Sequence, residues 1–173
     1  DLCCGSGTAL AEAAATIGAE SLPIKIVGVD LVQSLGCGKT DYNCLHLVAA
    51  SLTDWQPDEQ FDLITCVHGL HYIGDKLGLI ARAAAWLTER GRFVANLDMN
   101  NVKLRGQQPA SRIISAELRR NGFTYSSRTK LIQCDGRRQC TFPLAYLGAD
   151  DTVGPNYTGQ AAVDSYYDRK VLV

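Results

Sequence analysis

Short apolar runs alternate along the chain with stretches in which apolar residues recur at helical spacing. Runs rich in β-branched and other apolar residues, bounded by turn residues, predict strands at 24–30, 45–50, 61–67 and 92–98. Helical spacing with capping residues at the ends predicts helices at 8–17, from Asp75 to Gly91, and at 109–121. Strands that alternate with helices favour an α/β fold with a parallel, doubly wound sheet covered on both faces.

The C-terminal part of the chain departs from this alternation. Asp135-Gly136 is the strongest short hairpin signal in the sequence, and it predicts an antiparallel hairpin formed by residues 124–134 and 137–147. Residues 150–173 are polar and contain three tyrosines. We interpret this last segment as a lid, a docking segment or a frayed tail.

Composition narrows the class of protein. At 173 residues the chain is long enough for one domain with a sizeable core. It has no apolar run of the roughly 18 residues that a membrane helix needs, so we expect no membrane partner. The seven cysteines are an odd number without paired C-x-x-C spacing, which indicates reduced, buried thiols in a cytoplasmic protein rather than disulfides or zinc.

The net charge of −1 conceals an uneven distribution. Residues 1–100 carry 12 acidic and 6 basic side chains, whereas residues 101–140 carry 2 acidic and 9 basic ones. This basic segment could face an anionic substrate. We favour the simpler interpretation, in which it forms a solvated helix face and an arginine-rich edge hairpin.

The chain opens with the glycine turn Gly5-Ser6-Gly7, between Asp1 and the first predicted helix. Such a turn usually ends a strand, so we interpret Asp1-Leu2 as the last residues of a strand and the sequence as a fragment cut at a functional turn. Open α/β sheets bind ligands beyond the carboxyl ends of their strands, and glycines let the backbone approach a ligand closely. Asp30 ends the next predicted strand, where a carboxylate can accept hydrogen bonds from ribose hydroxyls.

Two other nucleotide motifs do not fit. A dinucleotide fingerprint, G-x-G-x-x-G, is incomplete because Leu10 stands in place of its third glycine. Gly38-Lys39-Thr40 matches the end of a phosphate-binding loop but lacks that loop's first glycine. We therefore interpret Gly38-Lys39-Thr40 as a chance match.

Four segments, in order, resemble the class I S-adenosylmethionine (SAM)-dependent methyltransferases. Asp1–Gly7 looks like the family's D-x-G-x-G-x-G turn with a cysteine in place of the first glycine, and residues 27–30 are similar to its acidic loop. The third segment is residues 50–57 followed by 61–64, and 61–64 resemble the family's fourth-strand motif. The fourth segment, residues 87–94, resembles the family's link from a helix into the fifth strand. The resemblance covers residues 1 to about 147.

This resemblance implies a mostly parallel, seven-stranded Rossmann-like sheet with an antiparallel C-terminal hairpin. The SAM-binding domain would comprise residues 1–149, with its first strand largely missing, and 150–173 would be its tail. In the family, an acidic residue after the third strand contacts the adenine amino group. The best match to that position here is Ser51, with Asp54 as the alternative. Leu52 would offer its backbone N–H to the adenine ring. The cofactor-binding residues implied by the resemblance are Asp1, Cys3, Gly5, Ser6, Gly7, Asp30, Leu31, Ser51, Leu52 and Cys66. Asp1, Cys3, Gly5 and Gly7 would surround the methionine part of SAM, so we expect a side chain at Gly7 to occupy ligand volume.

The reaction implied is in-line attack of an acceptor nucleophile on the SAM methyl group, which gives S-adenosylhomocysteine (SAH). A general base is needed only when the nucleophile carries a proton. His68, His71 and Tyr72 lie just past the fourth predicted strand and are the nearest candidates, with His71 preferred; packing or pocket-wall roles are the alternative. No metal is expected, because the polar residues 98–101 have no second acidic cluster to join them.

The acceptor class stays open at this point. We favour a small molecule or a protein group; an RNA methyltransferase that uses the basic segment 101–140 and a non-catalytic SAM-fold partner subunit are the alternatives. Residues 66–69, Cys-Val-His-Gly, replace the Asn/Asp-Pro-Pro-Tyr/Phe motif of enzymes that methylate exocyclic DNA amines, so that chemistry is disfavoured. The sequence leaves the oligomeric state undetermined.

Overall fold

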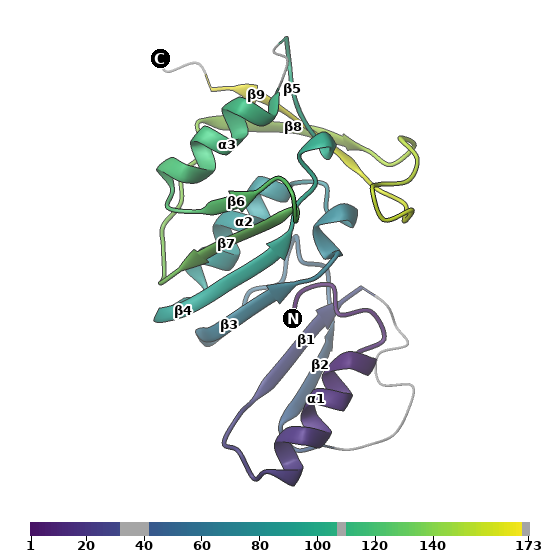
Figure 1. Ribbon diagram of the computed structural model, residues 1–173, viewed down its shortest axis with the longest axis vertical. Coiled ribbons are helices and arrows are strands. Elements are labelled where there is room, and N and C mark those ends of the chain that lie inside the picture. Colours follow the sequence, from purple (N-terminus) through teal and green to yellow (C-terminus); the bar gives the residue numbers. More distant parts are fainter. Residues whose placement is uncertain (32–41, 107–109, 171–173) are drawn as a thin grey trace.

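The computed structural model describes residues 1–31, 42–106 and 110–170, and Figure 1 shows its elements. Gly38-Lys39-Thr40 lies outside these residues. The helices are α1 (Thr8–Ala19), α2 (Lys76–Ala85) and α3 (Ala110–Arg120), with two short 3₁₀ turns, η1 (Gly69–Tyr72) and η2 (Met99–Asn101). The strands are β1 (Ile26–Asp30), β2 (Leu45–Ala49), β3 (Phe61–Cys66), β4 (Leu87–Asn96), β5 (Val102–Leu104), β6 (Thr124–Ser126), β7 (Leu131–Asp135), β8 (Leu144–Asp150) and β9 (Asp164–Arg169).

The described strands form three sheets, and the predicted mixed α/β architecture is confirmed. The sheets have the orders β1-β2, β3-β4-β7-β6 and β5-β9-β8. The pairs β1–β2, β3–β4 and β5–β9 are parallel, whereas β4–β7, β6–β7 and β8–β9 are antiparallel. In Figure 1, α1 lies beside the β1-β2 sheet, and β8 and β9 lie with α3 at the opposite end of the molecule.

Asp1 and Leu2 connect the first two sheets. The Asp1 nitrogen donates to the Val27 carbonyl over 2.7 Å, and the Val29 amide donates to the Asp1 carbonyl over 3.0 Å. On the other side, the Leu2 amide donates to the carbonyl of Thr65 in β3 over 2.8 Å. These two residues are therefore extended backbone between β1 and β3, as their sequence predicts.

The hairpin predicted at Asp135-Gly136 is wrong. Gly136 directly follows the last residue of β7, and its amide donates to the carbonyl of Gly91 over 2.7 Å, so the chain does not turn back into a hairpin there. β7 pairs with β4 and with β6, so the turn that reverses the chain lies before β7, at residues 127–130. The remaining antiparallel hairpin joins β8 to β9, which places part of the predicted tail in a sheet.

Two predicted helices end elsewhere than their glycines suggest. α1 continues through Gly18 to Ala19, and α2 ends at Ala85 because β4 already begins at Leu87, well before Gly91. The amide of Phe61 donates to the carbonyl of Trp86 over 2.9 Å, so the start of β3 holds the chain just past α2. α3 follows its prediction more closely, since Gly122 (φ +79°) lies directly beyond its last turn.

The core lies between α2, the central strands and β9. Leu77, Ile80 and Ala84 of α2 are buried, as their helical spacing predicts, and Phe93 and Ile132 are buried in the sheet. From the far end of the chain, Tyr167 of β9 is 1% exposed. Its hydroxyl donates to Asp75 Oδ1 and accepts a hydrogen bond from the Leu77 amide, both over 3.0 Å. The β8-β9 hairpin is thus packed on the start of α2.

Lys76 is a buried cation that also links α2 to the C-terminal segment. Its ammonium donates to the carbonyls of Ile73 (2.8 Å) and Val163 (2.5 Å) and to Ser165 Oγ (2.9 Å). Burial lowers the pKa of Lys76 to about 8, against the opposing attraction of Asp164. The Lys76 side chain is wholly buried, and removing its charge from water lowers its pKa. Keeping Lys76 protonated in the folded protein therefore costs free energy of folding.

Lys76 should make stability rise at alkaline pH. Its pKa of about 8 in the folded state lies below the ordinary 10.5, so between these values the unfolded chain binds more protons and the free energy of unfolding increases with pH. Relative to Lys76→Met, we expect the wild type to gain about 3 kcal/mol between about pH 7 and pH 10.5. Urea unfolding of both proteins at the two pH values measures this, and equal shifts for both would contradict it.

The helices of the described ranges do not reach the length and hydropathy of a membrane span. The six cysteines within residues 1–31, 42–106 and 110–170 are free thiols.

Candidate functional site

The opening turn is held between β1 and α1 by its own backbone. The amides of Cys3 and Cys4 both donate to the Val29 carbonyl, over 2.8 and 3.2 Å. Every second residue of the turn, Cys3, Gly5 and Gly7, has a positive φ (+60°, +61° and +80°). This left-handed backbone turns the chain from the extended residues Asp1-Leu2 into α1. Gly7 then accepts the first helical hydrogen bond of α1, from Ala11.

The two glycines of this turn face different surroundings. A Cβ built on Gly7 would come within 2.8 Å of Leu47 Cδ1, and Gly7 is buried. A Cβ built on Gly5 would meet no atom of the described protein within 4 Å. Gly7 is therefore required by packing against β2, and Gly5 is the glycine that borders open space.

Asp30 and Gly5 are brought together, as the sequence predicts. The Gly5 amide donates to Asp30 Oδ2 over 2.8 Å, so the carboxylate at the end of β1 faces the glycine turn. The Asp30 carbonyl accepts a hydrogen bond from Ala50 just past β2, which fixes the ends of both strands together. Leu31 follows with 72% of its surface exposed. An acidic acceptor, an open backbone turn and an exposed apolar side chain thus lie at one edge of the sheet.

The residues predicted to contact adenine lie just past β2 in a helical turn. The Ser51 carbonyl accepts hydrogen bonds from Asp54 (3.0 Å) and Trp55 (2.8 Å), and its hydroxyl accepts one from Thr53 over 3.2 Å. Leu52 is 5% exposed and its carbonyl accepts a hydrogen bond from Arg82 Nη2 over 2.6 Å. The Leu52 side chain therefore belongs to the core, while Asp54 is exposed. Their roles toward adenine stay predictions.

Two further predicted residues link the opening turn to β3: Asp1 bonds to β3, and Cys66, the last residue of β3, contacts Cys3. Asp1 Oδ1 accepts a hydrogen bond from Thr65 Oγ1 over 2.8 Å, so its carboxylate is directed to β3. Cys66 is fully buried, and its interaction with the Cys3 thiol, together with burial, raises its pKa. A Cβ on Gly69 would lie 2.5 Å from Cys3 Cβ and 2.7 Å from Cys66 Sγ. The turn after β3 is thus packed directly beneath the opening turn. The hydroxyl of Ser6 is paired with that of Thr8.

The predicted catalytic residues lie on this turn after β3. The His71 side chain is wholly buried, and its ring stacks on that of His68 at 5.9 Å between centroids. Both ring nitrogens of His71, and Nδ1 of His68, have no hydrogen-bond partner among the described residues. Burial lowers the pKa of His71, helped by the neighbouring His68, with Asp98 opposing. The lowered pKa favours the neutral form of the His71 imidazole. Tyr72 is about half exposed.

Sequence reasoning missed the residues around His71 that come from distant segments. The ring of Tyr157 lies 5.6 Å from that of His71 at 78°, and Lys130 Nζ lies 6.0 Å from the Tyr157 centroid. Lys130 also pairs with the buried Asp98 over 3.5 Å. The polar composition and the tyrosines of residues 150–173 indicated that this segment could form a lid. No local sequence pattern indicated that Tyr157 contacts His71.

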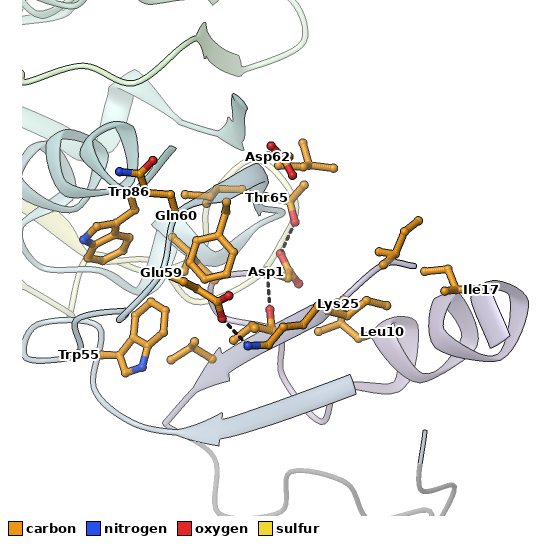
Figure 2. Close-up of a pocket in the computed structure, with 18 of the residues that line it drawn as sticks. Asp1, Leu10, Ile17, Lys25, Trp55, Glu59, Gln60, Asp62, Thr65 and Trp86 are labelled. Carbon is orange, nitrogen blue, oxygen red and sulfur yellow. Dashed lines mark hydrogen bonds and ion pairs between the residues drawn. The ribbon is translucent and has the colours of Figure 1, made fainter. Parts of the chain in front are cut away.

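A separate cavity of about 680 Å³ lies between β1 and β3. Figure 2 shows the bond from Thr65 to Asp1 at its border and the ion pair of Lys25 with Glu59 across it. Leu10 and Ile17 of α1 also line it. Of the site residues described above, Asp1 lines this cavity, whereas Gly5, Asp30 and His71 do not.

Many basic side chains of the segment 101–140 have acidic neighbours. The ion pairs are Lys103–Asp164, Arg105–Asp168, Arg120–Glu117, Lys130–Asp98 and Arg137–Glu89. Acids from outside the segment supply four of these five pairs. The local excess of positive charge is therefore smaller in the folded protein than in the sequence.

Comparison with known proteins adds a family to this geometry. A family model described as a methyltransferase domain matches residues 1–130 of the chain. No protein of curated function matches the sequence.

Several solved structures are similar to this chain, and two of them, with TM-scores of 0.52, share its fold. The DhpI–SAH complex is 17% identical, with a TM-score of 0.52 over 79% of this chain and 76% of DhpI. The [4+2]-cyclase SpnF is 16% identical, with a TM-score of 0.52 over 73% of this chain and 51% of SpnF. The plantazolicin methyltransferase BpumL, in complex with SAH and a triazolic desmethylPZN analog, is 13% identical, with a TM-score of 0.47 over 58% of this chain. The match spans 39% of the BpumL chain.

Proposed function

The chain belongs to the methyltransferase domain family, and on that premise we propose that it is a class I enzyme that transfers a methyl group from SAM to an acceptor. The observation that carries this proposal is the pairing of Gly5 with Asp30. It places an open glycine backbone and a carboxylate side by side at the carboxyl end of a parallel strand, where open α/β sheets bind nucleotides.

The residues present fit SAM. The backbone around Gly5 would border its methionine part, and Asp30 would accept hydrogen bonds from its ribose hydroxyls. Leu31 would cover the ribose and adenine from the solvent side, with Ser51 or Asp54 at the adenine amino group. When bound, SAM supplies an electrophilic methyl group, so the protein mainly orients the two reactants and excludes water.

His71 would handle the proton of the acceptor. As the new bond to the methyl carbon forms, the carbon–sulfur bond breaks and its electrons stay on sulfur, giving SAH. An O–H or N–H acceptor must also lose a proton, and a neutral imidazole can take it on a ring nitrogen. Neither ring nitrogen of His71 has a hydrogen-bond partner among the described residues, which supports His71 in this role over His68 and Tyr72.

We also propose that the first two sheets act as one Rossmann-like sheet. Asp1-Leu2 joins them in the order β2-β1-(Asp1-Leu2)-β3-β4-β7-β6, which contains seven extended segments. The site then lies at the carboxyl ends of the central parallel strands. The β5-β9-β8 sheet stands apart from this order, and the connection between β8 and β9 supplies Tyr157 and Val163 next to His71.

A small molecule or a protein group is the acceptor class that we favour. Five of the nine basic residues in the segment 101–140 already have acidic partners, which leaves less positive charge for an RNA backbone. The fold alone does not decide the reaction, because SpnF is described as a cyclase. Binding and turnover therefore have to be measured together.

Calorimetric titration with SAM, SAH and NAD tests the proposal. We expect SAM and SAH to bind at least about tenfold more tightly than NAD, a difference of about 1.4 kcal/mol. Methyl transfer is then sought by incubating the protein with labelled SAM and a cell extract. Preferential binding of NAD would overturn the proposal, and SAM binding without any labelled product would favour a non-catalytic partner subunit.

A further inference from the structure

Residues 154–163 form a closed loop with Tyr157 at its tip. Pro155 and Ala161 face each other as an antiparallel bridge, and the Asn156 amide donates to the Gln160 carbonyl over 2.8 Å. Inside the loop, Asn156 Oδ1 accepts hydrogen bonds from the amide and the hydroxyl of Thr158, over 2.7 and 2.6 Å. The loop therefore has a defined conformation that projects the Tyr157 side chain.

The base of the loop is fixed to the turn that carries His71. The Val163 amide donates to the His71 carbonyl over 2.8 Å, and the Val163 carbonyl accepts from the buried Lys76 ammonium. Directly after it, Asp164 begins β9 and accepts a hydrogen bond from Asn101 Nδ2 over 2.7 Å. The loop is thus anchored at one end by buried polar contacts, while Tyr157 at its tip is 47% exposed.

The tip contacts a buried imidazole that finds no hydrogen-bond partner in the part of the chain that the structure describes. His71 is wholly buried, and neither of its ring nitrogens makes a hydrogen bond to a described residue. Its edge-to-face contact with the Tyr157 ring provides no hydrogen bond to either nitrogen. An unpaired buried donor or acceptor costs roughly 1–3 kcal/mol. Such a group, beneath a half-exposed ring on an anchored loop, is arranged to be uncovered and paired when a ligand enters.

We propose that residues 154–163 form a cap over the acceptor side of the site and that the methyl acceptor takes the place of Tyr157 against His71. This inference rests on the proposed function for the identity of the ligand. The acceptor class that fits carries an O–H or N–H group, which gives a neutral imidazole a hydrogen-bond partner. Lys130, whose ammonium lies 6.0 Å from the centre of the Tyr157 ring, and its partner Asp98 would contact the acceptor's polar substituents once the ring moves.

Chemical modification of histidines by diethylpyrocarbonate, followed by peptide mass spectrometry, tests the cap without any acceptor. The chain has three histidines, and the exposed His46 serves as the internal reference. In the wild type we expect His71 to react at least about tenfold more slowly than His46, because the reagent must wait for local opening. Tyr157→Ala should raise the His71 rate about tenfold, whereas Tyr157→Phe, which keeps the ring, should leave it unchanged.

The outcomes separate the cap from the proposed function. SAM affinity should stay within about twofold of the wild type in Tyr157→Ala, because Tyr157 lies against the turn after β3 and not against Gly5 or Asp30. A wild-type His71 that reacts as fast as His46, or an unchanged rate in Tyr157→Ala, would overturn the cap. Loss of SAM binding in the wild type would instead overturn the proposed function and leave the modification pattern intact.

Discussion

Gly5→Asn should reduce SAM affinity by about 100-fold or more, which corresponds to about 2.7 kcal/mol. Gly5 has φ +61°, and asparagine is among the few residues that adopt this left-handed conformation at modest cost. The new side chain would meet no described protein atom near Cβ and would project into the open space beside the turn. That space is where we place the ligand, so the variant should fold and fail to bind.

Gly106→Asn is the matched control for this variant. Gly106 has φ +64° and, like Gly5, no described atom within 4 Å of a built Cβ, but it follows β5, far along the chain from the opening turn. Calorimetric titration with SAM should give wild-type affinity for Gly106→Asn. Comparable thermal unfolding of both variants would show that backbone strain is the same. Wild-type affinity in Gly5→Asn would mean that the turn does not border the ligand.

The same measurement separates Gly5 from Gly7. The sequence alone predicts that a side chain at Gly7 excludes the ligand, yet Leu47 occupies the space that its Cβ would need. We therefore expect Gly7→Val to lower the stability of the β2–α1 contact as well as ligand binding. Motif reading places both glycines in one turn, but only the packing partners distinguish the structural glycine from the one that borders open space.

Much of the fold follows from local signals. β1, β2 and β3 lie within the apolar runs that predict them, and the Asp30–Gly5 bond lies where the spacing of the two motifs places it. These features depend on short stretches of sequence and on the general rule that ligands bind at the carboxyl ends of parallel strands. Short-range sequence patterns are therefore sufficient to predict these three strands and the Asp30–Gly5 hydrogen bond.

Long-range pairing decides the features that the sequence does not predict. Asp135-Gly136 has the composition of a tight turn, but pairing of β7 with β4 and β6 takes precedence, and Gly136 bonds to Gly91 instead. Likewise, β9 pairs with β5 across some sixty residues of chain, which no local pattern specifies. The contact of Tyr157 with His71 depends on that pairing, so the cap could not be inferred from sequence.

Asp30→Ala should weaken SAM binding by roughly tenfold or more, because hydrogen bonds to a charged acceptor contribute about 1.5–3 kcal/mol each. Asp30 also holds the Gly5 amide over 2.8 Å, so two causes are combined in this variant. Asp30→Asn separates them, since its amide oxygen can still accept from Gly5 while the negative charge is lost. Titration of both variants with SAM, beside thermal unfolding, is the measurement.

The pattern of the two losses identifies what Asp30 does. If the carboxylate holds the ribose hydroxyls, Asp30→Asn should lose nearly as much affinity as Asp30→Ala, because an amide is a weaker acceptor and has no charge. Wild-type affinity in Asp30→Asn, with a loss in Asp30→Ala, would instead assign Asp30 to the shape of the opening turn. If both variants bind SAM as tightly as the wild type, the ribose lies elsewhere, and the site proposed at the end of β1 is wrong.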